Sequence, residues 1–326
     1  MGARMLVVAG LNLDKAWPDE AVGAARALRG ASARLLLEVA QRGIDLGVDG
    51  LVVLGGLWEP STVRSSTVSD ARAVLGSMPY TVLVLPNAAD AAGNFRPQTL
   101  VDWPSTVDWV EPESRAVVTL GSSKFAVMGP SATGSPPLDE VVAMLTTHPS
   151  PPTAPFPVIR SASLGDLTRS SLTVASLIPG SGGGRPRGAL VTYDVTAGIQ
   201  ATDVDFGERV GLMRRLSLDQ FGDTSSLLGA LDDLVRRCDP LDRVVVSGSV
   251  GPRVLVPPAL GWQPGRDDVT VVWRDLSYRF PTDAPRDQTV SAELVRRLSG
   301  AGPDEARRHQ ALALGLSSLE GAEETT

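Results

Sequence analysis

The residues that could do chemistry in this chain are few. Asn12 and Asp90 each follow an apolar run, and Asp166 lies farther along the chain. Their carboxylate and amide oxygens are ligands that Mg²⁺ or Ca²⁺ accepts, so together they could form a sparse and weak cation site. Asn and Asp also cap helices and stabilise turns, and we favour that structural role for all three.

The chain has two histidines, His148 and His309, and one cysteine, Cys238. His148 could be a metal ligand or a proton donor, but a lone histidine beside a proline more often has an ordinary structural role. His309 stands on a predicted C-terminal helix and is interpreted as structural. Two histidines and one cysteine cannot supply a Ser-His-Asp or Cys-His nucleophile, which excludes that class of hydrolase.

A glycine-rich segment, GSGGGRPRG at 180–188, carries Arg185 and Arg187. Glycine-rich backbone with arginine can bind a phosphate, but a flexible hairpin with solvated arginines is the commoner outcome. The segment lacks the strand-then-helix setting and the Lys-Ser/Thr pair of a P-loop, which argues against nucleotide hydrolysis. Trp58 could stack on a base or fill the core, and we favour core filling.

The N-terminal third predicts the elements that would position these residues. Buried parallel strands are indicated by apolar runs at 5–9, from 51 to the glycines Gly55 and Gly56, and at 80–85. Helical spacing over 21–46 and 66–75 predicts the crossover helices between them. In open α/β sheets ligands bind beyond the carboxyl ends of the strands, so the loops after these three strands are the candidate site.

After residue 86 the sequence pattern changes, and it predicts antiparallel strand pairs in place of βαβ units. Expected elements are a hairpin of strands at 117–120 and 124–128, a helix within 138–147 with or without a following strand, a proline-rich loop at 150–157, paired strands at 172–178 and 189–195, and a strand at 199–206. Beyond Glu208, strands at 213–218, 243–249 and 269–276 with a helix at 224–238 predict an α+β unit, followed by helices at 289–298 and 303–316. We expect domains at 1–207 and 208–288, C-terminal helices at 289–319 and a disordered tail at 320–326.

Composition narrows the function classes. The chain of 326 residues is 43 % hydrophobic and 21 % charged, as folded proteins are. Its net charge of −7 argues against nucleic-acid binding by bulk electrostatics, although a local basic groove is compatible with it. A single cysteine fits a reducing compartment, and no run resembles a signal peptide or a membrane span. We therefore predict a cytoplasmic protein without a membrane partner.

The strand-end loops fall in the order of those in the calcineurin-like metallophosphoesterases, and the chain resembles their DNA-repair branch, the SbcD-type exonuclease subunit. That family carries D-x-H, G-D-x-x-D and G-N-H-D after three successive strands, then a lone His and a final G-H-x-H. The matching segments here are LVVAGLNLDK, LVVLGGLWE, VLVLPNAAD, LTTHPSPP and SLGDLT, and the likeness covers residues 1 to 290. The resemblance implies an α/β fold, a sandwich of two mixed sheets flanked by helices, with a small C-terminal α+β capping domain.

The metal-ligand positions implied by this resemblance have lost most of their donor atoms. They are occupied, in order, by Gly10, Asn12, Gly56, Ala88, Ala89, His148, Asp166 and Thr168. The family's two Mn, Mg or Zn ions clamp the attacking and leaving oxygens of a phosphate ester, which requires a dense set of anionic or imidazole ligands. Glycine and alanine offer none, so we expect no catalytic residue, no metal and no cofactor at these positions.

The resemblance therefore implies a pseudoenzyme that acts as a scaffold or binding subunit of a DNA-repair or DNA-processing complex. By the same resemblance, the helix at 25–44 would mediate a homodimer, and residues 289–316 would dock an SMC-like ATPase of the SbcC type. Two alternatives stay open. One is a weak metal-dependent phosphodiesterase or nuclease that uses His148 and a few oxygen ligands. The other is a non-catalytic DNA-binding module that uses Arg185 and Arg187.

Overall fold

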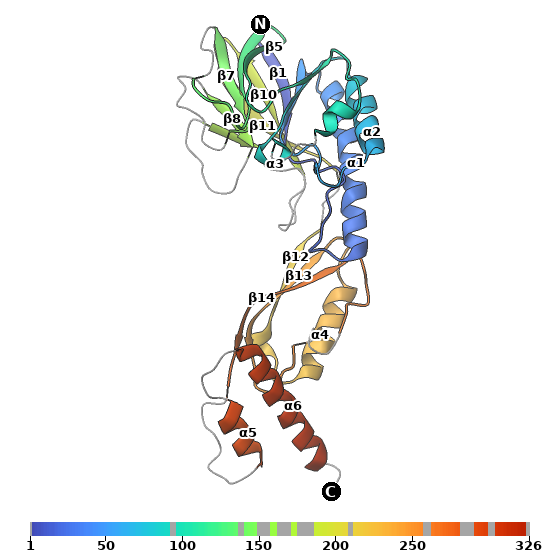
Figure 1. Cartoon of the computed structure of the whole chain (residues 1–326), viewed down its shortest axis with the longest axis vertical. Coiled ribbons are helices and arrows are strands. Elements are labelled where there is room, and N and C mark those ends of the chain that lie inside the picture. The colour runs from blue at the N-terminus through green and yellow to red at the C-terminus, as the bar shows by residue number, and fades with distance from the viewer. Residues whose placement is uncertain are drawn as a thin grey trace. The chain divides into compact units, whose positions relative to one another are not determined.

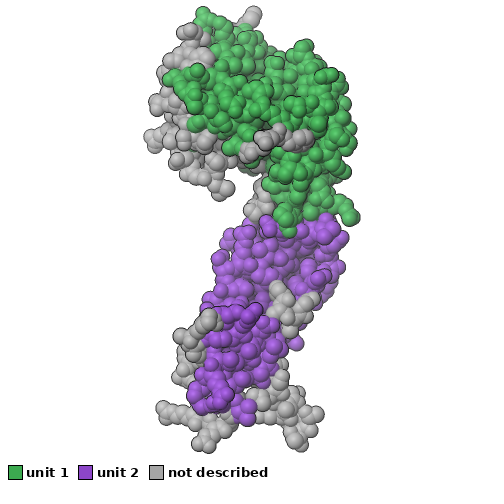
Figure 2. Space-filling model, in the orientation of Figure 1, with its two compact units in different colours: residues 1–18, 25–210 green, residues 19–24, 211–326 purple. Residues whose placement is uncertain are grey.

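The computed structural model describes residues 2–91, 96–135, 140–148, 157–161, 171–174, 186–207, 211–256, 262–280, 290–298 and 304–323. The chain forms two compact units: unit 1 contains residues 1–18 and 25–210, and unit 2 contains residues 19–24 and 211–326 (Figure 2). The candidate residues Asp166, Thr168 and Arg185 lie outside the described residues, as does the proline-rich segment from 150 to 156.

One sheet of unit 1 has the strand order β11-β10-β1-β2-β3-β4 (Figure 1). Its strands are β1 (Ala3–Val8), β2 (Gly50–Leu54), β3 (Thr81–Leu85), β4 (Val107–Trp109), β10 (Arg187–Asp194) and β11 (Gly198–Asp205). Strands β1 to β4 are mutually parallel, and β10 pairs antiparallel with both β1 and β11. Every residue of β2 is buried, as its uninterrupted apolar run predicts.

The second sheet of unit 1 has the order β5-β6-β7-β8-β9. Its strands are β5 (Arg115–Leu120), β6 (Ser123–Met128), β7 (Val141–Thr146), β8 (Val158–Ser161) and β9 (Ser171–Val174). The hairpin β5–β6 is antiparallel, as predicted, and β6 to β9 are parallel.

One open alternative is decided in this sheet, and one prediction is wrong. The segment 138–147 was predicted as a helix with or without a following strand, and residues 141 to 146 form strand β7, whose apolar run lies between two neighbouring strands. The strands predicted over 172–178 and 189–195 do not pair with each other. Strand β9 pairs with β8, and β10 pairs with β1 and β11 in the other sheet. Pairing between distant strands leaves no local pattern by which sequence reasoning could have found it.

The two sheets of unit 1 pack face to face over one apolar core. Alternate residues of β1, Met5 and Val7, join Phe125 and Val127 of β6 and Leu145 of β7 in that core. Helices α1 (Val22–Asp45) and α2 (Ser65–Gly76) lie on the outer side of the six-stranded sheet (Figure 1). The short α3 (Ala88–Ala91) and η1 (Pro97–Leu100) follow β3. This mixed α/β arrangement of sheets flanked by helices confirms the predicted fold class.

Unit 2 is built on the parallel sheet β12-β13-β14. Its elements are β12 (Met213–Ser217), η2 (Leu218–Gln220), α4 (Thr224–Arg236), β13 (Arg243–Val250), β14 (Thr270–Tyr278), α5 (Val290–Leu298) and α6 (Glu305–Glu323). Helix α4 is capped by Asp223, whose side chain accepts from the backbone N–H of Ser226, and its apolar face packs on the sheet. Helix α6 continues past Glu320, where the disordered tail was predicted to begin. No helix of the described residues is both long enough and apolar enough to cross a membrane.

Candidate functional site

The loops after β1, β2 and β3 meet at one edge of the six-stranded sheet. The backbone N–H of Gly10 donates to the carbonyl of Gly55 (2.9 Å), and that of Asn12 donates to the carbonyl of Gly56 (2.7 Å). The N–H of Gly55 donates in turn to the carbonyl of Leu85, at 2.8 Å. The sequence prediction that these loops converge is therefore correct, because the carboxyl ends of parallel strands share an edge.

The segment that carries His148 reaches the same edge from the second sheet. The hydroxyl of Thr147 donates to the carbonyl of Pro86, which directly follows β3, at 2.5 Å. His148 itself is half-buried, and its backbone N–H donates to the hydroxyl of Thr146 at 2.9 Å. Four of the five segments that were singled out in the sequence thus lie together, while the fifth, around Asp166, is outside the described residues.

Glycine is required where these loops come closest. Gly10 and Gly56 both have positive φ angles, of 63°. A Cβ on Gly56 would lie 3.1 Å from the Cα of Gly10 and 3.4 Å from Oδ1 of Asn12. Glycine at position 56 therefore permits close contact between two backbone segments.

Asp90 is a carboxylate that links two of these loops. Its Oδ2 accepts from the backbone N–H of Gly56 (2.7 Å) and from that of Asn87 (2.9 Å), while the Asp90 N–H donates to Oδ1 of Asn87 (2.9 Å). Burial raises the pKa of Asp90 to about 6 and the charge of Glu59 adds to this, although the two backbone hydrogen bonds act in the opposite direction. The carboxylate links two strand ends.

The donor set at this edge does not fit a two-metal centre. Gly10, Gly56, Ala88 and Ala89 offer no side-chain donor, and the amide of Asn12 donates to the carbonyl of Gly10 at 3.0 Å. Within the described ranges, no group of three or more His, Cys, Asp and Glu side chains could hold a metal ion. The described residues thus lack the anionic ligands that such a centre requires.

Two other candidate residues have structural contacts. Trp58 is 3 % exposed and stacks on Trp109, with ring centroids 5.1 Å apart, which confirms core filling. The guanidinium of Arg187 donates to Asp205 at 3.0 Å and lies 3.8 Å from Asp203 on the neighbouring strand. Two carboxylates therefore already balance its charge.

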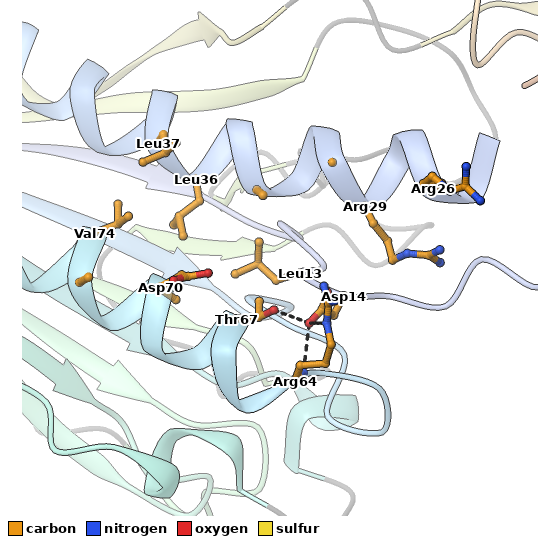
Figure 3. Close-up of a pocket in the computed structure, with 14 residues that line it drawn as sticks. Leu13, Asp14, Arg26, Arg29, Leu36, Leu37, Arg64, Thr67, Asp70 and Val74 are labelled. Atoms are coloured by element: carbon orange, nitrogen blue, oxygen red, sulfur yellow. Dashed lines mark hydrogen bonds and ion pairs between the residues drawn. The ribbon is translucent and has the colours of Figure 1, made fainter. Parts of the chain in front are cut away.

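A second candidate site, a groove between α1 and α2, was missed in the sequence (Figure 3). At its floor Oδ1 of Asp14 accepts from Nη2 of Arg64 (2.7 Å), and Oδ2 accepts from the backbone N–H of Arg64 (3.0 Å) and from the hydroxyl of Thr67 (2.5 Å). The partners lie about fifty residues apart in the chain, so no local motif indicates the contact.

Asp14 is held as a carboxylate by these partners. Burial is the largest influence and acts to raise its pKa, but the hydrogen bonds from Arg64 and Thr67 and the charge of Arg64 together bring the pKa below its ordinary value. Asp14 also supplies the cap for α2, because Arg64, at the N-cap position, has no capping side-chain bond of its own. The charge of Asp14 at the floor of the groove is therefore balanced by Arg64.

No model of a known protein family and no curated protein matches the sequence. Among solved structures, the chain is similar to one described as a novel archaeal phosphodiesterase, with 8 % identity, a TM-score of 0.35, and coverage of 62 % of this chain and 99 % of that one. It is also similar to a protein of Thermus thermophilus, with 11 % identity, a TM-score of 0.37, and coverage of 63 % and 99 %. These TM-scores are too low to assign the chain to a family.

Proposed function

We propose that this chain is a non-catalytic relative of the metallophosphoesterases, a pseudoenzyme that acts as a binding or scaffold subunit. The observation that carries the proposal is the convergence of four candidate ligand segments at one sheet edge, joined by direct hydrogen bonds between Gly10, Gly55, Gly56, Asp90 and their neighbours. In support of this proposal, the loops that follow three parallel strands meet at one edge, as the site of a two-metal hydrolase would require. The atoms that would hold its ions are replaced by backbone contacts.

The first experiment asks whether the edge binds metal and hydrolyses a phosphodiester. Purified protein is titrated with Mn²⁺ in a calorimeter and assayed with bis-p-nitrophenyl phosphate, with and without Mn²⁺, beside the variants His148→Ala and Asp90→Asn. We expect no stoichiometric binding and no hydrolysis above the buffer rate. Turnover that chelation removes and that either variant abolishes would instead establish the weak metal-dependent phosphodiesterase.

The proposed partner is an SMC-like ATPase of the SbcC type, docked on the C-terminal helices, in a complex that processes DNA. The proposal rests on the resemblance over residues 289–316. Val290, at the start of α5, is 70 % exposed, so a substitution there can test the contact without disturbing the core. A homodimer through α1 is the second interaction that we propose.

The partner is tested by light scattering after gel filtration of the full chain, alone and with an SMC-like ATPase from the same genome. We expect a complex that Val290→Asp weakens. Val195 is also 70 % exposed, in unit 1, so Val195→Asp is the matched control and leaves the complex intact. An inert monomer that forms no complex would refute the scaffold role.

A DNA-binding role without catalysis is the weaker alternative, because two acidic neighbours already pair with Arg187 and the chain is acidic overall. It predicts salt-dependent binding of a DNA duplex that weakens in Arg185→Ala/Arg187→Ala. Fluorescence anisotropy at two salt concentrations measures this. Binding that is strong at low salt and lost in the double variant would favour this alternative over the scaffold role.

A further inference from the structure

The groove between α1 and α2 has a volume of about 720 Å³ and is lined only by residues of unit 1. Sites for small organic molecules have volumes of roughly 300–1,000 Å³, so this groove is of the right size. It lies on the helical side of the six-stranded sheet. Leu13 and Asp14 of the loop after β1 line it, whereas Gly10, Gly56 and Asp90 do not.

One end of the groove is basic. Arg26 and Arg29 are one helical turn apart on α1, and Figure 3 shows both side chains toward the same end. Neither guanidinium has a carboxylate partner in the part of the chain that the structure describes. Arg64, the N-cap residue of α2, also lies at this end of the groove and is paired with Asp14. Two guanidinium groups are therefore available to an anion, in a chain whose net charge is −7.

The other end is apolar. Leu36 and Leu37 of α1 face Val74 of α2, and Leu13 lies between this end and the arginines (Figure 3). Leu37 is 58 % exposed, and an apolar body placed beside it would remove that surface from water. Ala33, Ala71 and Ala73 also line the groove, and their small side chains leave room between α1 and α2.

We propose that this groove binds a small amphipathic anion, a molecule with one carboxylate or phosphate group on an apolar chain or ring. The anionic group lies between Arg26 and Arg29, and the apolar body lies along Leu37 and Val74. Asp70, on the α2 wall near the apolar end, repels an anion there. The distribution of charge thus determines the orientation of the ligand.

The test uses two probes with the same apolar chain, decanoate and decyl phosphate, titrated into the full-length protein by calorimetry below their micelle concentrations. Decan-1-ol, acetate and inorganic phosphate test each half of the ligand separately. We expect one saturable site for at least one of the two amphipathic anions. Comparing the affinity for decanoate with that for decyl phosphate shows whether the site prefers a carboxylate or a phosphate group. Decan-1-ol, acetate and inorganic phosphate each bind at least about tenfold more weakly than the amphipathic anion that binds more tightly.

Matched variants locate the site. Arg26→Gln/Arg29→Gln weakens anion binding by about tenfold or more. Arg42→Gln, which removes one positive charge from the last turn of α1, outside the groove, has no effect. Ala33→Trp fills the groove from an exposed position and abolishes binding. Circular dichroism checks that each variant is folded. The proposal is overturned if neither anion binds saturably, if the double variant binds as the parent does, or if decan-1-ol binds as tightly as the anions.

Discussion

The Oδ2 atom of Asp90 lies 2.7 Å from the backbone nitrogen of Gly56, so one carboxylate joins the loop after β3 to the loop after β2. The same oxygen accepts from the backbone N–H of Asn87 at 2.9 Å. Both loops follow parallel strands whose carboxyl ends share this edge of the sheet. Here the carboxylate satisfies two N–H groups that would otherwise lack acceptors at the edge of the sheet.

Asp90→Asn and Asp90→Ala should have different effects on the stability of unit 1. The Asn side-chain oxygen can still accept both N–H bonds without burying a charge, so we expect little change or a gain at pH 8. Alanine leaves both N–H groups without their acceptor, which costs about 1–3 kcal/mol each when buried. Urea unfolding of each variant measures this. An equal loss in both variants would show that the hydrogen bonds are not what the carboxylate contributes.

The stability of unit 1 should also depend on the ionisation of Asp90. Because its pKa in the folded protein is raised from 3.8 to about 6, the folded state holds this proton more tightly than the unfolded chain does. The resulting stability is present below pH 3.8 and is lost as pH rises to about 6, by an amount on the order of 2–3 kcal/mol. The free energy of unfolding of the parent minus that of Asp90→Asn isolates this contribution. A difference that stays flat between pH 4 and pH 7 would contradict it.

Asp14 should be a stabilising carboxylate with the opposite dependence on pH. Its pKa is lowered in the folded protein, so its contribution is present above pH 3.8 and is lost as pH falls toward the lower, folded value. We expect Asp14→Asn to cost about 1.5–3 kcal/mol at pH 7, because it weakens charge-assisted hydrogen bonds to Arg64 and Thr67. Asp45→Asn, at an exposed acid on α1, is the control with an effect within about 0.5 kcal/mol.

Arg64→Gln should cost less than Asp14→Asn. The Arg64 side chain is 71 % exposed, so solvent screens its charge, and its backbone N–H still donates to Asp14 in the variant. Thermal unfolding of the two variants at pH 7 compares them. A larger loss in Arg64→Gln would mean that the ion pair, rather than capping of α2, dominates the contribution of Asp14.

In unit 2 the most sensitive acidic residue should be Asp242. It is 1 % exposed and accepts from Nε of Arg214 (2.7 Å), from the N–H of Leu212 (2.6 Å) and from the N–H of Asp239 (3.1 Å). Asp242→Ala leaves the N–H groups of Leu212 and Asp239 without their acceptor, which costs about 1–3 kcal/mol for each, while the Arg214 side chain, 30 % exposed, can be solvated. Asp233→Ala, in an exposed pair with Arg236, is the control and should cost less than about 1 kcal/mol.

Hydrogen exchange of the amides of α4 and β13 reports on these unit 2 variants. Asp242→Ala should speed exchange in both elements, and Asp233→Ala should leave exchange near that of the parent. Equal exchange rates in the two variants would contradict the assignment of Asp242 as a buried structural partner.

The sequence was sufficient for the elements whose patterns are local. The apolar runs of β1, β2 and β3 and the periodicity of α1 and α2 predicted those elements, and the glycines after two of the strands correctly indicated abrupt loops. The loss of donor atoms at Gly10, Gly56, Ala88 and Ala89 could also be read directly, because it depends on residue type alone. Convergence of these loops followed from the general geometry of parallel sheets.

The tertiary structure decided what depends on contacts between distant residues. Residues 141–146 form a strand, and β9 and β10 lie in different sheets. Asp90 accepts a hydrogen bond from Gly56, and Asp14 is paired with Arg64. The groove between α1 and α2 exists only because both helices pack on the same side of one sheet. Such relationships leave no periodic signal, since a hydrogen bond across thirty or fifty residues is determined by how the whole chain packs and by neither segment alone.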